Sequence, residues 1–266
     1  TEDYGKVRLD AKGVRKGGGP LGAALEPMLV SGVVFYLHRG RELALVSRAE
    51  VERQWPELRR DVVRMAYAGA VLELADALIS ELEPDARVFG LLETTLGLMA
   101  ETPEPGLEGV LWWFELSLAG ALGYAPDLAR CVECGAEVRE RAALAPLLGG
   151  VLCESCATEH GVPSETECEA AATLVKLAGD GRRGDAVPEG PSDRALQATA
   201  RASAGVRDEI NETLLAFLEE HAGRRLRLKS LSFLAQVRRV ESGAARVGDR
   251  GKGEKGSAEN RNGEPE

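Results

Sequence analysis

The sequence predicts an α+β protein with more than one domain: a β-rich N-terminal part is followed by a mainly α-helical part that carries a cysteine-rich insertion. Three observations support this prediction. Apolar and polar residues alternate near the N-terminus, apolar residues recur at helical spacing from Pro56 onwards, and two pairs of cysteines lie between the expected helices. With 266 residues, of which 44% are hydrophobic, the chain can form packed cores, which excludes wholly disordered and collagen-like classes.

The first 48 residues are expected to form strands. Residues 7–11 alternate between apolar and charged side chains, which is the period of a half-buried strand. Two further β-rich runs, at 29–37 and 43–46, flank a turn at 39–42 and predict a hairpin. A glycine-rich loop at 13–22 joins the first strand to the second. Together these elements predict part of a small barrel or sheet.

Beyond Pro56 the hydrophobic period changes to that of helices with one apolar face. One helix begins at Ser164 with a Ser-x-x-Glu capping box, and a linker at 179–191 precedes the next helix. From Ser242 onwards the sequence has no hydrophobic period, which predicts a disordered tail. The predicted helices span 57–82, 86–100, 107–122, a segment that starts at 164, 193–222 and 226–240.

We therefore expect three parts in the chain. Residues 1–50 form the β-rich domain, residues 51–241 form the helical domain with the cysteine-rich segment at about 129–160, and residues 242–266 form the tail. The aromatic cluster at 112–114 is expected in the core of the helical domain rather than as a platform on which bases stack.

Four cysteines form the strongest motif, in the pattern Cys-x2-Cys, eighteen residues, Cys-x2-Cys. Two residues between thiolates allow both sulfurs of one turn to point at the same ion, and two such turns complete a tetrahedral site. Four protein ligands leave no open position for water, so we expect one structural Zn²⁺. A pair of redox-active Cys-x-x-Cys motifs is the alternative. The expected zinc ligands are Cys131, Cys134, Cys153 and Cys156.

The remaining candidate residues give weaker signals. Cys168 shares a helical face with small apolar residues, so a buried thiol is expected there rather than a fifth ligand. Three scattered histidines, His38, His160 and His221, have no nucleophile motif beside them and do not support a hydrolytic triad. Residues 17–22 match Gly-x-Gly-x-x-Gly, but strand-like sequence follows them, whereas a dinucleotide site needs this pattern at the start of a helix.

Charge is distributed unevenly along the chain, although the net charge of −10 by itself argues against a nucleic-acid partner. Residues 1–48 carry +3 and residues 222–255 carry +7, whereas residues 49–221 carry −18. The two basic ends are therefore candidates for phosphate binding, with a solvated surface that balances the acidic middle as the alternative. The candidate DNA-binding residues are Lys6, Arg8, Lys12, Arg15, Lys16, Arg224, Arg225, Arg227 and Lys229.

The sequence also bears on cellular location. No run approaches the roughly 18 consecutive apolar residues of a membrane span. The chain opens on Thr1 without a signal peptide or an initiator methionine, so we expect the natural N-terminus to lie before this residue. Five cysteines, an odd number, fit a reducing compartment better than a disulfide framework. We therefore expect a cytoplasmic protein with no membrane partner.

Several short segments, taken in order, resemble the bacterial RecO family of recombination mediators. The resemblance spans residues 4 to about 240, and the order of its segments around a four-cysteine ribbon makes it specific. The segments that carry it are 5–13 (Gly-Lys-Val-Arg-Leu-Asp-Ala-Lys-Gly), 25–27 (Leu-Glu-Pro), the stretch around Tyr67, Leu72–Leu74 and Asp76, 114–116 (Phe-Glu-Leu), 122–128 (Leu-Gly-Tyr-Ala-Pro-Asp-Leu) and 228–230 (Leu-Lys-Ser).

This resemblance implies an N-terminal OB-fold β-barrel, a mainly α-helical domain and an embedded zinc ribbon. Family members have a further strand before residues 5–9, so the barrel implied for this chain lacks an edge. The resemblance also implies a cytoplasmic, nucleoid-associated protein that is not an enzyme. Such proteins bind single- and double-stranded DNA, anneal complementary strands, and act with RecR and the acidic tail of single-stranded-DNA-binding protein (SSB) to help load RecA in the RecF pathway of DNA repair.

Two other classes of function stay open from the sequence. One is a zinc-stabilised protein-interaction adaptor that never contacts DNA. The other is a thiol- or metal-dependent enzyme, which would need an exchangeable zinc ligand or reactive thiols. A closed four-sulfur site instead predicts slow reaction with thiol reagents until the metal is removed.

Overall fold

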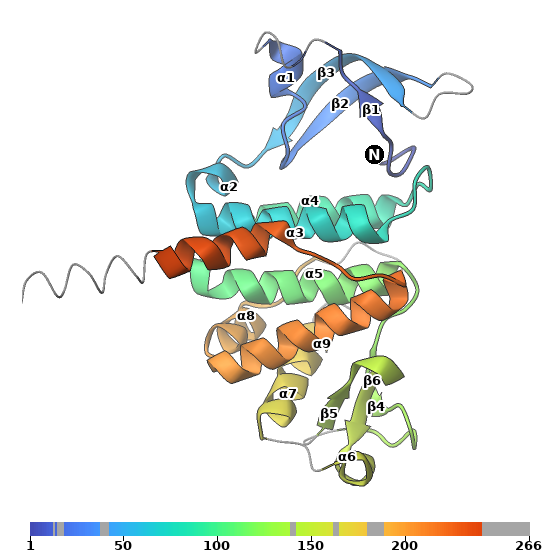
Figure 1. Ribbon diagram of the computed structural model, residues 1–266, viewed down its shortest axis with the longest axis vertical. Coiled ribbons are helices and arrows are strands. Elements are labelled where there is room, and N and C mark those ends of the chain that lie inside the picture. Colours follow the sequence, from blue (N-terminus) through green and yellow to red (C-terminus); the bar gives the residue numbers. More distant parts are fainter. Residues whose placement is uncertain are drawn as a thin grey trace, which may run out of the picture.

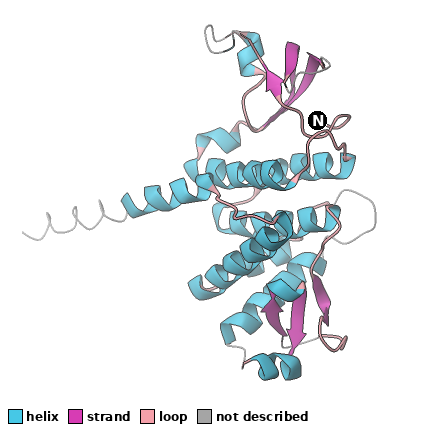
Figure 2. Cartoon of the chain, turned by 45° about the vertical axis from the view of Figure 1, so that its right-hand side comes forward, coloured by secondary structure: helices cyan, strands magenta, loops and turns pink. Residues whose placement is uncertain are grey.

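The computed structural model describes residues 1–12, 14, 19–37, 43–138, 142–161, 165–179 and 189–240. Figure 1 shows a sheet at the N-terminal end of the molecule, a stack of helices in the middle and a second, smaller sheet at the opposite end. The turned view in Figure 2 shows the same separation of the two sheets by helices. The predicted turn at 39–42, Arg15, Lys16, the capping residue Ser164 and the tail from 242 lie outside the described residues.

Three strands form the N-terminal sheet: β1 (Leu9–Asp10), β2 (Leu29–Tyr36) and β3 (Ala44–Gln54), in the order β1-β3-β2. Strands β2 and β3 pair antiparallel, which confirms the two strands predicted there from their β-rich sequences. Phe35 of β2 lies opposite Val46 of β3, so their side chains share one face of the sheet.

The N-terminal sheet is open. The described residues of this part contain three strands, and β1 has only two residues instead of the five predicted at 7–11, so the sheet does not close into a barrel. The loop predicted at 13–22 also contains a short helix, α1 (Pro20–Ala23). Proline at its first position accounts for this difference, because proline fixes φ at a helical value where no backbone donor is needed.

Helix α5 (Leu107–Ala121) is the centre of the helical part. It contacts α3 (Val62–Leu78), α4 (Ala86–Glu101), α7 (Glu165–Gly179) and α9 (Ala204–Ala222), and its residues are buried on all sides. A helix that is apolar all round belongs in a core. Among the described residues, no helix is both long and apolar enough to cross a membrane.

The aromatic cluster of α5 lies in this core, as predicted. Trp112, Trp113 and Phe114 are at most 1% exposed, which leaves no face on which a base could stack. The indole Nε1 of Trp112 donates a hydrogen bond of 2.7 Å to Asn211 Oδ1 on α9, so its polar atom is satisfied inside the core.

Two predicted helices are each split into two in the structure. The segment 57–82 contains α2 (Glu57–Arg60) and α3, because Asp61 is extended and its carboxylate accepts from the backbone N–H of Val63 at 2.8 Å. The segment 193–222 contains α8 (Asp193–Ala200) and α9, which Ser203 caps in the same way. Short polar side chains compete for backbone donors and start new helices, which the hydrophobic period alone does not reveal.

The C-terminal segment runs back along α3 and ends in a helix at 229–240. Its start is fixed by Arg224, whose guanidinium donates to the backbone oxygen of Ala77 at 2.6 Å. Further on, the Ser230 hydroxyl donates to Glu73 Oε1 at 3.0 Å. The segment approaches α3 closely at Gly69, where a Cβ would lie 2.4 Å from Ser230 Oγ. Glycine at position 69 therefore allows the last helix to pack closely against α3.

Glu115 is the buried carboxyl group of α5, with 5% of its surface exposed. Burial, and then the nearby charge of Glu108, raises the pKa of Glu115 to about 8 from its ordinary value of 4.5. Between these two pH values the folded protein holds a proton that the unfolded chain releases, so the contribution of Glu115 to stability is greatest below about pH 4.5 and declines as pH rises towards 8. The slope is at most about 1.4 kcal/mol per pH unit.

We therefore expect Glu115→Gln to remove this pH dependence and to raise the free energy of unfolding at pH 7.5, because the amide carries no ionisable proton. Urea unfolding between pH 5 and 8 measures the effect. Glu159→Gln, an exposed site on α6 (Glu154–His160), is the control and should leave the slope unchanged. An unaltered slope in the Glu115 variant would contradict the assignment.

Candidate functional site

A small three-stranded sheet carries the four cysteines at the end of the molecule opposite the N-terminal sheet (Figure 1). Its strands are β4 (Asp127–Cys131), β5 (Ala142–Ala145) and β6 (Gly150–Cys153), in the order β4-β6-β5. Helix α6 follows β6 directly, with Cys153 as its N-cap residue. The ends of two neighbouring strands thus bring the two Cys-x2-Cys turns together.

The four sulfur atoms of Cys131, Cys134, Cys153 and Cys156 all lie within 4.8 Å of one another. The sulfurs of Cys134 and Cys153 are 3.7 Å apart. Four sulfurs at the usual zinc–sulfur bond length occupy the corners of a tetrahedron with edges of about 3.8 Å. The group could therefore hold one metal ion with four protein ligands, an arrangement that leaves no position for a reacting water.

Local backbone geometry supports the two turns. Gly135 has a φ of +74°, a conformation that glycine adopts without strain, and its N–H donates to the oxygen of Cys131 at 2.9 Å. In the second turn, the thiol of Cys153 lies 3.1 Å from the hydroxyl of Ser155. This hydrogen bond, followed by the backbone N–H of Cys156, lowers the pKa of Cys153 to about 6. A lowered pKa favours the thiolate, which is the form that binds metal.

The other cysteine and a nearby histidine lie outside the four-sulfur cluster. Cys168, on α7, is half-buried rather than buried as predicted, and it does not belong to the cluster. His160, the last residue of α6, pairs instead with Glu133 at 3.1 Å between Nε2 and Oε2. This contact ties α6 to the first turn, and the sequence pattern contained no sign of it.

The basic residues of the two chain ends come together around the C-terminal end of α3. Lys6 Nζ lies 2.9 Å from Asp76 Oδ1, and Arg8 Nε lies 2.6 Å from Glu81 Oε1. The contact of Arg224 with Ala77 is at the same helix end. The sequence predicted both basic ends but neither their convergence nor the carboxylates that pair with them, because the partners lie about 70 or more positions away in sequence.

The other predicted DNA-binding residues differ in environment. Arg225 is 91% exposed, with its Nε 4.0 Å from Glu219 Oε2. Arg227 and Lys229, which follow it closely in the sequence, are also exposed. Lys12 is exposed two residues beyond the end of β1. Arg15 and Lys16 lie outside the described residues.

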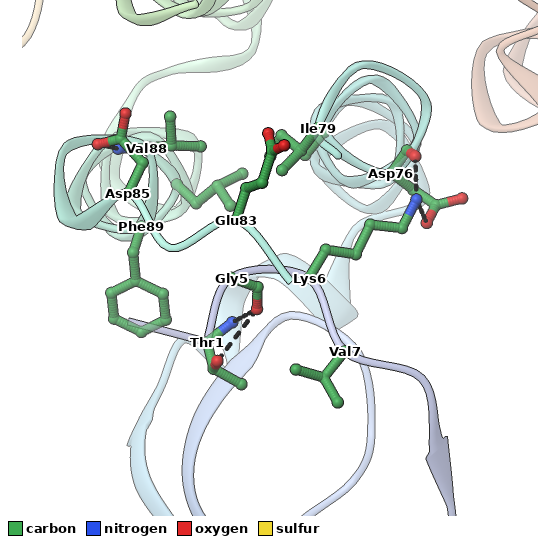
Figure 3. A pocket seen from close by; sticks show the side chains of 12 residues that line it. Thr1, Gly5, Lys6, Val7, Asp76, Ile79, Glu83, Asp85, Val88 and Phe89 are labelled. Atoms are coloured by element: carbon green, nitrogen blue, oxygen red, sulfur yellow. Dashed lines mark hydrogen bonds and ion pairs between the residues drawn. The ribbon is translucent and has the colours of Figure 1, made fainter. Parts of the chain in front are cut away.

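A cavity of about 280 Å³ opens beside Lys6, between the N-terminal segment and the turn from α3 to α4. Figure 3 shows Lys6 reaching from the segment before β1 towards Asp76, while Ile79, Val88 and Phe89 line the apolar side. The backbone N–H of Leu82 donates to the oxygen of Lys6 at 3.0 Å, so the two segments are also joined by their backbones. The N-terminal segment is thereby held against the helical part.

Comparison with known families covers both parts of the chain. The model of the Recombination protein O N terminal matches residues 1–55, and that of the Recombination protein O C terminal matches residues 59–180. The two matches together extend from the N-terminal sheet through α7.

Several full-length relatives are similar over most of the chain. The DNA repair protein RecO of Symbiobacterium thermophilum is 36% identical over 242 residues, which cover 90% of this chain and 88% of the relative. The DNA repair protein RecO of Desulforudis audaxviator is 32% identical over 237 residues, which cover 89% of this chain and 88% of the relative. That of Anaeromyxobacter dehalogenans is 36% identical over 232 residues, which cover 85% of this chain and 84% of the relative. The chain belongs to the RecO family of DNA repair proteins.

Proposed function

We propose that this protein is a recombination mediator that binds single- and double-stranded DNA, anneals complementary strands and acts with RecR and SSB to help load RecA. The observation that carries the proposal is the family match, in which a relative is similar over 90% of the chain and the family models match residues 1–55 and 59–180. The reaction breaks no covalent bond, so no catalytic residue is assigned. We place the protein in the cytoplasm, at the nucleoid.

The domain organisation is part of this proposal. We assign residues 1–50 to an OB-fold domain, whose described strands are β1, β2 and most of β3, which continues to Gln54. We assign residues 51–241 to the helical domain with its ribbon at 129–160. An OB-fold binds nucleic acid on a face of its strands and in the adjacent loops. The basic residues Lys6 and Lys12 flank β1 and would contact phosphates there.

One structural Zn²⁺ is proposed at Cys131, Cys134, Cys153 and Cys156. The support is the sulfur spacing, which fits a tetrahedral thiolate site. The ion when bound would stabilise the fold of the ribbon and supply no catalysis. The four thiolates would be its complete ligand set, and the pair of Glu133 and His160 would hold the ribbon's helix beside it.

We place the SSB tail in a groove between α3 and the last helix. The groove has a volume of about 310 Å³, and Met28, Met65 and Phe233 form its apolar lining. Lys229 and Glu73 also line it, and the carboxylate of Glu73 accepts a hydrogen bond from Ser230. Arg59 donates to the oxygen of Pro27 at 2.7 Å beside Met28. An acidic peptide that buries apolar side chains requires this combination of an apolar floor and basic edges.

Strand annealing tests the proposed function directly. Two complementary oligonucleotides, each coated with SSB and labelled with a donor or an acceptor fluorophore, are mixed with the protein. Pairing is expected to accelerate at least tenfold over SSB-coated strands alone, because one protein that holds both strands raises their effective concentration. Protein heated past its unfolding transition is the control. No acceleration, together with no binding to naked oligonucleotides, would contradict the proposal.

A zinc-stabilised adaptor that does not contact DNA is the second candidate. The observation that favours it is the pairing of Lys6 and Arg8 with carboxylates of the same chain, which reduces the charge available to phosphate. The two candidates differ in salt dependence, since the affinity of a phosphate-binding protein falls steeply with salt. Absent or salt-insensitive binding in a gel-shift titration between 50 and 300 mM salt (roughly the range over which counterion effects are large) would favour the adaptor.

A further inference from the structure

Two segments that are distant in sequence meet at the C-terminal end of α3. The first contains Lys6 and Arg8, and the second begins at Arg224 and runs along α3 to Ser230. The carbonyl end of a helix carries partial negative charge, and both Lys6 and Arg224 donate to backbone oxygens there, at Asp76 and Ala77. The helix end therefore gathers cations from both ends of the chain.

These cations follow the axis of α3. Arg224 lies beside Ala77 and Ser230 lies beside Glu73, four residues or about 6 Å earlier along the helix. Arg225, Arg227 and Lys229 lie on the same stretch and are exposed. A row of cations along a helix fits a polyanion with regularly repeated charges, which is the chemistry of a nucleic-acid backbone.

The carboxylates beside this row are of two kinds. Glu73 and Glu219 accept hydrogen bonds from the backbone N–H groups of Ser230 and Leu226, so they hold the segment in place, although Glu219 Oε2 also lies 4.0 Å from Arg225 Nε. Asp76 and Glu81, in contrast, pair with Lys6 and Arg8. The side chains of Arg8 and Glu81 are 59% and 42% exposed, and an ion pair this exposed is weak and easily exchanged. The side chain of Lys6 is 28% exposed and that of Asp76 is 78% exposed, so solvent reaches this pair mainly from the side of the carboxylate.

We propose that Lys6, Arg8, Arg225, Arg227 and Lys229 form one phosphate-binding surface across the end of α3, and that Asp76 and Glu81 compete with nucleic acid for its first two cations. The proposal rests on the proposed function. The backbone of bound DNA displaces the two carboxylates, and these intramolecular pairs lower affinity at rest. Asp76 and Glu81 thus lower the affinity of this surface for nucleic acid.

Neutralising these carboxylates should therefore strengthen binding. Asp76→Asn and Glu81→Gln are each expected to raise the affinity of the full chain for a fluorescent 30-nucleotide single strand by about threefold at low salt, since the cation that each carboxylate pairs with becomes available to a phosphate. The gain should shrink towards onefold as salt screens the interaction. Glu159→Gln and Glu169→Gln, exposed exchanges on α6 and α7, are controls with the same change of net charge.

A double-mutant cycle separates a local effect from a general loss of negative charge. If Asp76 acts by holding Lys6, the gain from Asp76→Asn should disappear in a Lys6→Gln background. A gain that persists in the Lys6→Gln background, or that the control exchanges reproduce, overturns the proposal. Unchanged or weaker DNA binding by folded Asp76→Asn and Glu81→Gln variants also overturns it. Failure of the proposed function itself is a different result, because then the unmodified chain binds no DNA.

Discussion

Replacing Cys134 by serine is expected to remove the metal and to unfold the ribbon from β4 to α6. The buried cluster of the ribbon consists of Cys131, Ala143, Ala145, Leu152 and Ala157, which are mostly small side chains. Such a cluster buries little apolar area and does not stabilise a separate unit by itself. In isolated zinc fingers the metal contributes about 10 kcal/mol or more to folding, so its loss has a large effect.

Metal content and limited proteolysis measure this result. The unmodified protein should contain about one zinc per chain, whereas the Cys134→Ser variant should contain none and should be cleaved between 127 and 160. The core around α5 should stay largely folded, because its largest buried side chains all lie on helices, although Leu128, Ala142 and Val151 of the ribbon also pack into it. Cys168→Ser is the matched control and should keep its zinc, since Cys168 lies outside the cluster. Zinc retained by the Cys134 variant, or an unmodified protein that is folded and metal-free, would refute the site.

Reversing the charges of Arg225, Arg227 and Lys229 to glutamate is expected to weaken binding to single-stranded DNA by about 100-fold at low salt. Each lost phosphate contact should also reduce the slope of log K against log salt by about 0.7. Arg224 is deliberately retained, because its guanidinium binds the end of α3 and its reversal would disturb the fold. Fluorescence anisotropy across a salt series measures both quantities.

The control reverses three exposed cations on other elements, Lys176 on α7 and Arg194 and Arg201 in and after α8. This variant has the same net charge as the triple reversal but keeps the surface at the end of α3. Its affinity should fall only slightly. Equal losses in both variants would mean that the overall charge of the protein, rather than this surface, governs binding.

Most of the helices and strand β2 were predictable because their signals are local, whereas β3 was predicted only over 43–46 and extends to Gln54. Hydrophobic periods placed α4 and α5 to within one residue of their observed ends, and the β-rich runs placed β2. The splits at Asp61 and Ser203 were missed, although both residues are good N-caps. A capping residue within a continuous apolar period does not by itself show that one helix ends and another begins. The sequence predicted part of a small barrel or sheet, and the family resemblance implied an incomplete OB-fold barrel; the described strands form an open sheet of three strands.

The four-cysteine cluster was determined by sequence alone, because each ligand pair is separated by two residues and a single turn brings its sulfurs together. Only the tertiary structure shows which charged residues lie close together. Two basic ends and an acidic middle were visible in the sequence, but only the fold places Arg224 against a helix end 147 positions away and sets Asp76 against Lys6. Electrostatic interaction depends on distance in space, so a charge pattern along a chain specifies neither which cations share a surface nor which carboxylates oppose them.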